Sequence, residues 1–428
     1  MIDLNDLRAR PEAYQRACEL KRLKVDIGAF LALDVEYRRM KTEFEGDRAK
    51  QNAFNKELPK LTGAEKERKL AEMKSLAAGL KDRTEALRML EERWEREQLL
   101  VPSIPLENVP HGSSDAENVE RKRWGTIPQF SFKPLDHVEL GKRLDIIDID
   151  RGVKVAGARS YFLKGDGARL NHAVLSLAMD LLHRKGFTIM DPPHIVPYKA
   201  MMATGYFPGG EEAAYHLDER DADRHLIGTA EVPVASYHID EILNPEELPK
   251  RYAGYSPCYR REAGAYGKDT HGLYRVHQFH KVEQVVLCKN DVAESARFHA
   301  ELLGNAEELM QLLEVPYRVV DVCTGDMGQG QVFKNDIEAW MPSRNGYGET
   351  HSCSTFHDFQ ARRLNTRYRG GEGKNVFCHT LNNTLIATPR ALIPLLENNQ
   401  QSDGSVVVPP ALRPYMGGQE RIVPRSGA

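Results

Sequence analysis

The residues whose types and spacing suggest chemistry lie between Ser256 and Cys288. Two stretches typical of strands, Pro257–Glu262 and Arg275–Leu287, flank a loop that is rich in glycine, which predicts an antiparallel hairpin with a long tip. Because side chains alternate between the faces of a strand, ionisable groups gather on one side of each: Cys258, Arg260 and Glu262 on the first, and Arg275, His277, Lys281 and Glu283 on the second. Burying so many such groups is costly unless they face a polar ligand. A sheet edge with a solvated face remains the alternative.

The composition of the 428 residues excludes several classes of protein. Hydrophobic residues make up 41% and charged residues 28%, which is typical of a globular chain. The 59 basic and 62 acidic residues give a net charge of −3, which argues against a uniformly basic coat for DNA or RNA. We expect no DNA partner and, because no apolar stretch could span a bilayer, no membrane. Met1–Tyr14 has no apolar run, and the six cysteines form no C-x-x-C pair, so a reducing cytoplasm is the expected location.

Residues 29–100 predict two long helices that fold back on each other. Apolar residues recur at alternating steps of three and four, and Pro59–Gly63 interrupts the pattern with a helix stop and a turn. The predicted seam consists of Phe30, Leu33, Tyr37, Met40, Phe44, Phe54, Leu58 and Leu61, followed by Leu70, Met73, Ala77, Leu80, Thr84, Leu87 and Trp94. We therefore expect a coiled-coil hairpin that projects as an arm.

The charges on this hairpin leave its role open. Residues 48–74 contain eight basic and four acidic side chains, a balance of +4 that suits a phosphate backbone. The same counts fit a solvated helix surface with ion pairs, or a plain dimerisation or spacer element. Residues 101–125 form an expected linker, because Pro102, Pro105 and Pro110 prevent a helix. Beyond it, Ala168–Lys185 predicts an amphipathic helix and Phe187–Met190 a strand.

Several motifs of this sequence closely resemble those of a known family. Tyr259-Arg-Arg-Glu-Ala-Gly264, continued by Gly267 to Glu283, closely resembles motif 2 of the seryl-tRNA synthetases, which are class II aminoacyl-tRNA synthetases. Residues 172–197, which include Lys185-Gly-Phe-Thr-Ile-Met-Asp-Pro-Pro193, resemble motif 1, and residues 379–400, which begin with His379-Thr-Leu-Asn-Asn-Thr384, resemble motif 3. The resemblance spans nearly the whole chain in the family's order.

The resemblance implies an α+β fold: a class II antiparallel sheet flanked by helices, preceded by an N-terminal antiparallel helical hairpin. It divides the chain into a tRNA-binding domain at residues 1–100, the linker at 101–125 and a catalytic domain at 126–428, with motif 2 at about 256–286. It also implies that the protein is a homodimer. The implied reaction activates L-serine with ATP to seryl-adenylate, releases pyrophosphate, and transfers serine to tRNA(Ser), with tRNA(Sec) a further candidate acceptor.

The family's ATP-binding residues can be assigned to matching positions of this sequence. The resemblance implies that Arg260 bridges the α-phosphate and the serine carboxylate, and that Arg390 holds the γ-phosphate, which makes these two arginines the catalytic residues. It implies Mg²⁺ bridging the phosphates through Glu349 and Ser352, and no zinc, because the cysteine pairs are absent. The full implied ATP set is Arg260, Arg261, Glu262, Val276, Glu349, Thr350, His351, Ser352 and Arg390.

The residues that bind the substrate serine are implied in the same way, by their positions in the family's motifs. Thr229 and Glu231 are implied to receive the ammonium group, and Glu283 with Thr384 to contact the hydroxyl, a pair that alanine would leave without a partner. Ala230, Arg260 and Asn382 complete the implied serine set. Thr229 has an alternative role as the cap of a helix that begins near Glu231.

Two positions depart from the family's motifs, and two alternative functions have to be weighed against aminoacylation. His271 occupies a position where the family has a basic residue, usually arginine, and Ala387-Thr-Pro-Arg390 replaces the glycine-containing form of motif 3. A ligase that loads an amino acid onto a carrier protein would lack the helical arm. A catalytically inactive tRNA-binding paralogue would have lost Arg260, Glu283 or Arg390, and all three are present.

Overall fold

The computed structural model describes residues 1–217, 220, 223–263 and 272–424, so His271 lies outside the described residues. The chain divides into two compact units, Met1–Pro102 and Ser103–Ala428. In the described part of the chain, no helix is both long and apolar enough to cross a membrane.

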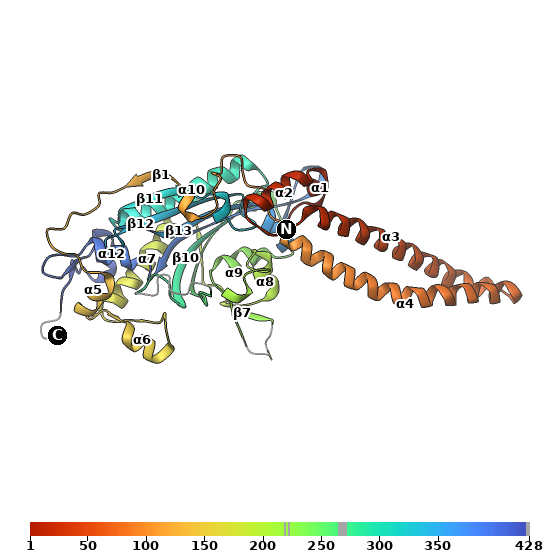
Figure 1. The fold of residues 1–428 in the computed structure, drawn as a ribbon, viewed down its shortest axis with the longest axis horizontal. Coiled ribbons are helices and arrows are strands. Elements are labelled where there is room, and N and C mark those ends of the chain that lie inside the picture. The colour runs from red at the N-terminus through yellow and green to blue at the C-terminus, as the bar shows by residue number, and fades with distance from the viewer. Residues whose placement is uncertain (218–219, 221–222, 264–271, 425–428) are drawn as a thin grey trace. The chain divides into compact units, whose positions relative to one another are not determined.

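The N-terminal unit is helical, and two of its helices form the predicted hairpin. Its elements are α1 (Leu4–Ala9), α2 (Pro11–Leu20), α3 (Ile27–Glu57) and α4 (Gly63–Leu100), with a short 3₁₀ turn at Leu58–Lys60. Cross-helix ion pairs join Asp47 to Arg83 and Glu57 to Lys69. The second pair lies nearer the turn on both helices, so the two helices run antiparallel (Figure 1). The 31 and 38 residues of α3 and α4 correspond to roughly 47 and 57 Å at 1.5 Å per residue.

The contact stripe of the second helix differs from the prediction at alternate positions. Phe30, Leu33, Tyr37 and Phe54 of α3 are buried as expected, and so is Leu80 of α4. The predicted seam members Leu70, Ala77 and Thr84, however, are exposed, and the half-buried residues of α4 include Met73, Leu76, Leu87, Leu90 and Trp94. The correct spacing from Met73 is three and then four residues, whereas the prediction used four and then three. Both phases satisfy a heptad, and only the packing against α3 selects one of them.

A buried carboxylate joins three helices at the base of the hairpin. Arg8 of α1 donates two hydrogen bonds to Asp34 of α3, both 2.9 Å long, and the indole of Trp94 in α4 donates a third to the same carboxylate. Burial opposes the charged form, but these donors lower the pKa of Asp34 overall. Tyr37 and Trp94 stack beside it with ring centroids 4.7 Å apart.

The second unit is built on one large sheet with the strand order β1-β11-β12-β13-β16-β10-β9-β4 (Figure 1). All neighbouring strands are antiparallel except β4, which runs parallel to β9. The strands are β1 (Val119–Trp124), β4 (Thr188–Met190), β9 (Lys250–Tyr259), β10 (Gln278–Cys288), β11 (Tyr317–Asp321), β12 (Phe333–Met341), β13 (Gly346–His357) and β16 (His379–Thr388). The expected antiparallel sheet flanked by helices is therefore confirmed.

Helices of this unit pack on the sheet, and small two- and three-stranded sheets surround it. The helices are α5 (His137–Arg143), α6 (Ile149–Ala156), α7 (Asp166–Arg184), α8 (Tyr198–Ala203), α9 (Glu231–Ala235), α10 (Val292–Leu312), α11 (Phe359–Leu364) and α12 (Leu392–Asn398). The short strands are β2 (Ile147–Asp148), β3 (Phe162–Leu163), β5 (Ile195–Pro197), β6 (Tyr215–His216), β7 (Arg224–Leu226), β8 (Ile242–Leu243), β14 (Arg367–Arg369), β15 (Asn375–Phe377), β17 (Val406–Val407) and β18 (Arg421–Ile422).

The two faces of the central strands have different roles. On β10 and β16, residues of one parity (Val282, Val286, Leu381 and Leu385) belong to the main hydrophobic core together with α7 and α10. Residues of the other parity include Lys281, Glu283, Asn382 and Thr384, which line a cavity. This alternation follows from the two-residue period of a strand and turns the polar set of motif 2 toward one side.

The motif 2 hairpin is shorter than predicted at its open end. β9 ends at Tyr259 and β10 begins at Gln278, so Arg260–Glu262 and Arg275–His277 lie outside the strands that we expected at Pro257–Glu262 and Arg275–Leu287. Arg260 still donates a backbone hydrogen bond to His277, but Glu262 has a φ of +50°, which is incompatible with an extended strand.

Candidate functional site

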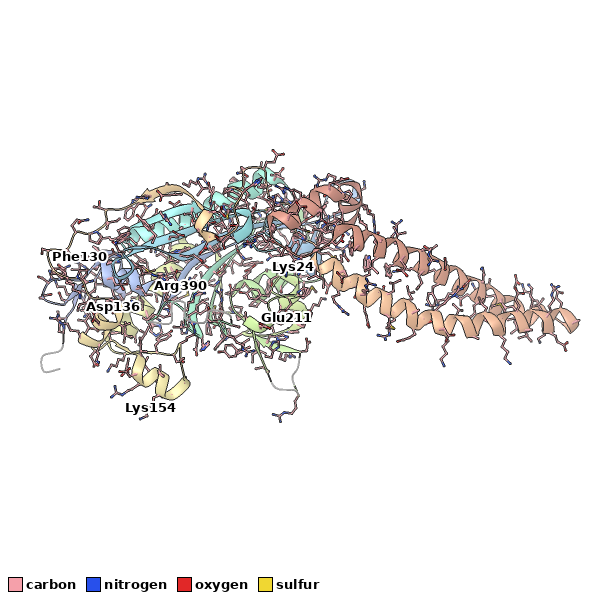
Figure 2. The ribbon with its side chains drawn as sticks, viewed as in Figure 1. Lys24, Phe130, Asp136, Lys154, Glu211 and Arg390 are labelled. Carbon is pink, nitrogen blue, oxygen red and sulfur yellow. The ribbon has the colours of Figure 1, made fainter. Side chains whose placement is uncertain are left out.

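The site is a cavity of about 330 Å³ on the polar face of the sheet. Strands β10, β13 and β16 form its floor. Its walls come from the segments Thr204–Tyr206, Leu273–Val276 and Gly328–Gln331, together with the N-terminal end of α9. Arg390, which Figure 2 labels, follows β16 and lines the same cavity. Residues more than 180 positions apart in the chain are thus brought to one place.

Most of the residues that the sequence singled out line this cavity. They are Thr229, Glu231, Arg260, Glu262, Val276, Glu283, Glu349, Thr350, Ser352, Asn382, Thr384 and Arg390. Three others do not: Ala230 is buried before α9, Arg261 is exposed, and His351 is buried beside Thr350, whose hydroxyl oxygen lies 2.8 Å from its Nδ1. Burial lowers the pKa of His351 to about 4, so this imidazole is neutral.

One end of the cavity contains a buried carboxylate with two polar partners. Lys281 Nζ lies 2.5 Å from Glu283 Oε2, and the hydroxyl of Thr384 donates to the same oxygen over 3.2 Å. Burial by itself would lower the pKa of Lys281, but the charge of Glu283 outweighs it and the pKa is raised. Lys281 therefore keeps its charge, and Thr384 is held where a small hydroxyl could join the pair.

A second carboxylate faces this pair from the start of α9. Burial, and then the negative charge of Glu283, raise the pKa of Glu231 to about 7. The hydroxyl of Thr229 accepts a hydrogen bond from the backbone N–H of Glu231 over 3.2 Å, but the N-cap of α9 is Ala230 and no side chain caps this helix, so Thr229 fixes the backbone of Glu231 without being the cap that we considered. Thr229 also lines the cavity, and the two roles are compatible.

Arg260 lies between the two ends of the cavity. Its Nε donates to the carbonyl of Gly228 over 3.2 Å, and its guanidinium lies 5.2 Å from the centroid of the Phe279 ring. Within the described part of the chain, its two terminal nitrogens form no hydrogen bond of their own. A planar guanidinium held at Nε and over a ring presents its remaining N–H groups in a fixed direction.

Two arginines and an aromatic ring form the other end. Arg390 donates to the carbonyl oxygens of Tyr274 over 3.0 Å and of Glu349 over 3.1 Å, and stacks on the Tyr274 ring at 4.3 Å. Arg275 donates to Glu262 over 3.2 Å, next to the apolar side chain of Val276. The arrangement combines cationic groups with flat and apolar surfaces, which suits a nucleotide with its phosphates.

The oxygen donors beside Arg390 fit a phosphate-bound Mg²⁺. Glu349 and Ser352 of β13 both line the cavity, and Asp336 pairs with Ser352 across the β12–β13 ladder. Asp336 is bound to Lys334 over 3.0 Å, whereas its Oδ1 is buried and has no hydrogen-bond partner among the described residues. No group of three or more His, Cys, Asp or Glu that could hold a metal occurs among the residues described. A donor set of one or two oxygens suits an ion that takes its other ligands from phosphates and water.

A buried histidine and a buried glutamate support the base of the motif 2 loop. The backbone N–H of Leu273 donates to Nε2 of His137 over 3.1 Å, so the hydrogen of the neutral ring must lie on Nδ1, which is 2.8 Å from Glu397. The other oxygen of Glu397 accepts from the backbone of Ser343. The α12 helix thereby fixes the loop segment that supplies Tyr274, Arg275 and Val276 to the cavity.

Sequence reasoning assigned no role to several residues of the site. Lys281 could have been predicted as a site residue, because it shares strand parity with Glu283. Tyr274 and Tyr206 come from loops, and His137 contacts Leu273 from 136 positions earlier in the chain, so no local pattern indicates their contacts.

Family models match both units. The tRNA synthetase class II core domain (G, H, P, S and T) matches residues 215–399, and the seryl-tRNA synthetase N-terminal domain matches residues 1–105. The serine–tRNA ligase of Deinococcus radiodurans is 46% identical over 98% of both chains, and that of Rubrobacter xylanophilus is 43% identical over 97% of this chain and 98% of its own.

Solved structures agree over the full length. The seryl-tRNA synthetase of Pyrococcus horikoshii, crystallised with ATP, covers 100% of both chains with a TM-score of 0.90 and 36% identity. The cytoplasmic serine–tRNA ligase of Naegleria fowleri, in complex with AMP, covers 97% of this chain and 96% of its own with a TM-score of 0.84 and 31% identity.

Proposed function

The chain belongs to the seryl-tRNA synthetases, a family of class II aminoacyl-tRNA synthetases, and from this membership we propose how its own residues perform the reaction. Its activity is that of a serine–tRNA ligase, which activates serine with ATP and transfers it to tRNA. Activation of an amino acid for a carrier protein and a catalytically inactive role are both disfavoured by relatives that match the whole chain.

The observation that supports this proposal best is the composition of one cavity. An acidic end formed by Glu231 and Glu283 can receive an ammonium group and a hydroxyl, while a cationic end formed by Arg390 and Arg275 can receive phosphates. Arg260 lies where the carboxylate of the first ligand meets the α-phosphate of the second. Serine and ATP are the pair of ligands whose groups match this order.

In the first step, a carboxylate oxygen of serine attacks the α-phosphorus of ATP, and the bond to the pyrophosphate oxygen breaks. The products are seryl-adenylate and pyrophosphate, and no protein nucleophile is required. The protein aligns the two reactants and stabilises the negative charge that spreads over the phosphate oxygens. Arg260 can donate to the serine carboxylate and the α-phosphate at once, and Arg390 can neutralise the leaving pyrophosphate.

Selection of serine rests on the pair Glu283–Thr384. A serine hydroxyl can donate to Glu283 and accept from a neighbouring donor, which replaces the hydrogen bonds it makes in water. Alanine has the same backbone groups but would leave these buried polar groups without a ligand partner, which weakens binding strongly.

We propose that Glu349 and Ser352 hold Mg²⁺ when ATP binds. Once bound there, the ion neutralises phosphate charge next to Arg390. The carboxylate of Glu349 and the hydroxyl of Ser352 are the oxygen ligands that Mg²⁺ prefers, and the unpartnered Oδ1 of Asp336 adds a further acceptor beneath them.

We assign the N-terminal unit to tRNA binding and the rest of the chain to catalysis. Of the linker expected at residues 101–125, Val119–Trp124 instead forms β1 of the large sheet, so the connecting segment is shorter than expected. The hairpin carries its excess of basic residues at positions 48–74, near its turn, where a phosphate backbone could bind. In the second step, a hydroxyl of the terminal ribose of tRNA(Ser) attacks the seryl carbonyl and AMP leaves.

We also propose a homodimer formed through the motif 1 region. Apolar side chains exposed there are Ile189 of β4 and Ile195 of β5. In addition, β4 is the last strand of the large sheet, so its outer edge pairs with no other strand of the described residues. A two-fold symmetric contact would cover both features, because the same surface of each copy would be buried.

The six free, buried cysteines suit a cytoplasmic enzyme.

The decisive experiment is ATP–pyrophosphate exchange with a panel of amino acids, followed by charging of tRNA. We expect exchange with serine to exceed exchange with alanine, threonine, glycine and cysteine, and serine to be transferred to tRNA(Ser). Exchange that depends on another amino acid, or adenylate formation without transfer to tRNA, would contradict the proposal.

A further inference from the structure

The amide of Gln360 is fixed in one orientation beneath the cavity. Gln360 lies on α11 with only 1% of its surface exposed. Its Nε2 is 3.2 Å from the carbonyl oxygen of Thr204 and 2.7 Å from Oε1 of Glu231, and its Oε1 accepts a hydrogen bond of 2.7 Å from the hydroxyl of Thr380. Because a carbonyl oxygen can only accept, the NH₂ group must face Thr204 and therefore Glu231.

This contact occupies one oxygen of Glu231 and restricts the carboxylate. Gln360 donates to Oε1, and a donor to a carboxylate favours its charged form. The other groups that act on Glu231 all lie toward the cavity: Glu283 and Lys281 of β10, Arg260, and Tyr206 of the loop after α8. Gln360 is thus the neutral support behind the carboxylate, and the charged groups lie in front of it.

The two carboxylates of the serine end therefore differ in their support. Glu283 is paired with the ammonium of Lys281 at 2.5 Å, whereas Glu231 is supported by a neutral amide. Burial and the charge of Glu283 raise the pKa of Glu231 to about 7. Near neutral pH, a substantial fraction of Glu231 consequently carries a proton before a ligand binds.

We propose that Gln360 is a positioning residue that holds Glu231 for the ammonium group of serine, and that serine binding expels a proton from Glu231 into the solvent. The inference rests on the proposed function, because it requires serine at this end of the cavity. The proton leaves as the carboxylate forms, and the ammonium group then supplies the counter-charge. Thr380 acts one step further away by fixing the amide of Gln360.

The first test is the pH dependence of kcat/KM for serine in pyrophosphate exchange, measured from pH 6 to pH 9. The quantity compared is the ratio of variant to parent enzyme, which cancels ionisations common to both. Gln360→Met keeps the length of the side chain but removes the donor, so the pKa of Glu231 should rise further. We expect the ratio to be about three- to tenfold lower at pH 6 than at pH 9, while KM for ATP stays within about twofold.

Two further sets of variants separate positioning from packing. Thr380→Val removes the hydroxyl that orients the amide and should give a smaller change in the same direction, whereas Thr380→Ser should restore the profile of the parent. Gln331→Met is the matched control, because Gln331 lines the same cavity but bonds Ser354. Its ratio should not vary with pH.

Calorimetry gives a readout that does not depend on turnover. L-Serine is titrated into the parent enzyme at pH 7 in phosphate and in Tris buffer, whose ionisation enthalpies differ. The difference in heat should correspond to release of about half a proton per serine bound, as expected for a group with a pKa near the working pH. Gln360→Met should release more than the parent.

The outcomes are distinguishable. A ratio for Gln360→Met that stays flat from pH 6 to pH 9, or serine binding to the parent without proton release, overturns the inference. If Gln360→Met does not fold, the Thr380 pair decides, and a flat ratio for Thr380→Val overturns it. If serine supports no exchange in the parent enzyme, the proposed function itself fails.

Discussion

At the scale of single residues, the cavity separates the groups that can stabilise phosphate charge from the groups that can recognise a substrate hydroxyl. Arg260 and Arg390 can stabilise the phosphates, and Glu283 with Thr384 can recognise a hydroxyl. Each of these contacts leads to a substitution with a defined kinetic effect.

Arg260→Ala should abolish adenylate formation and leave the fold intact. The side chain faces the cavity, and its one hydrogen bond within the described residues goes to Gly228, so its loss removes charge from the transition state rather than packing from the core. We expect ATP–pyrophosphate exchange to fall by about 100- to 1,000-fold, with an unchanged circular dichroism spectrum. Arg261→Ala is the comparison, because this neighbour is exposed and outside the cavity, and it should lose far less. Exchange by Arg260→Ala within a few-fold of the parent would contradict the assignment.

Thr384→Val should weaken the selection of serine over alanine. Valine has nearly the same shape as threonine but cannot donate to Glu283. We expect kcat/KM for serine to fall by about ten- to 100-fold and that for alanine to change much less. Thr384→Ser, which keeps the hydroxyl, should recover most of the selectivity. Equal losses for serine and alanine would show that Thr384 acts on packing and not on the hydroxyl.

At the scale of elements, the site depends on a loop that is held by a distant helix. His137 of α5 accepts from Leu273 in the motif 2 loop and contacts Glu397 of α12. Gly272 precedes Leu273 with a φ of +73°, and a Cβ at this position would lie 2.0 Å from His137 Nε2. Close approach and backbone conformation together require glycine here.

Gly272→Ala should therefore displace the segment that supplies Tyr274, Arg275 and Val276 to the nucleotide end. We expect KM for ATP in pyrophosphate exchange to rise by about tenfold or more, because the ring beneath Arg390 moves with the segment. Gly373→Ala is the matched control: Gly373 has a φ of +72°, but apart from its chain neighbours no described residue lies within 4 Å of a Cβ there. It should show only the cost of a left-handed backbone, about 1 kcal/mol of stability, and normal kinetics. Similar kinetics in both variants would disprove the clash with His137.

At the scale of the whole molecule, the two units divide the two steps of the reaction. Every cavity residue belongs to the unit Ser103–Ala428, and the hairpin belongs to Met1–Pro102. Adenylate formation should therefore be separable from transfer to tRNA.

Deletion of residues 38–93, closed with a short turn, should separate the steps. The cut lies just beyond the stacked rings of Tyr37 and Trp94, so the base of the hairpin around Asp34 is retained. Serine-dependent pyrophosphate exchange should stay within about twofold of the parent, and charging of tRNA(Ser) should fall mainly through KM for tRNA. If the shortened enzyme charges tRNA as well as the intact one, the hairpin is a spacer and the tRNA contacts lie on the catalytic unit.

Charging by the intact enzyme should weaken as salt rises, and the triple change Lys56→Gln, Lys60→Gln and Lys66→Gln should reduce that dependence. These three lysines are exposed and form no ion pair within the described residues, so their charges are available to phosphates. The plot of log KM for tRNA against log salt concentration should lose about two to three units of slope. Lys69→Gln is the control, because Glu57 already compensates Lys69 at 3.2 Å. An unchanged slope in the triple variant would exclude these lysines from the tRNA contact.

The amino-acid sequence alone determined the elements whose cause is local. The hairpin follows from its apolar repeat and its proline-glycine break, and the polar face of β10 follows from strand parity, which needs no knowledge of the partner strands. Through their resemblance to those of a known family, the motifs also predicted most of the residues that line the cavity.

The tertiary structure decided what depends on contacts between distant segments. The phase of the α4 stripe was set by packing against α3, and the strand predicted at Pro257–Glu262 stops short of Glu262, where the backbone is left-handed. Only the fold brings Gln360 of α11 to Glu231 of α9, or His137 of α5 to Leu273, because a hydrogen bond between residues more than 100 positions apart leaves no trace in the spacing along the chain. The same is true of the pKa of Glu231, since burial and the nearby charge of Glu283 exist only once the sheet has formed.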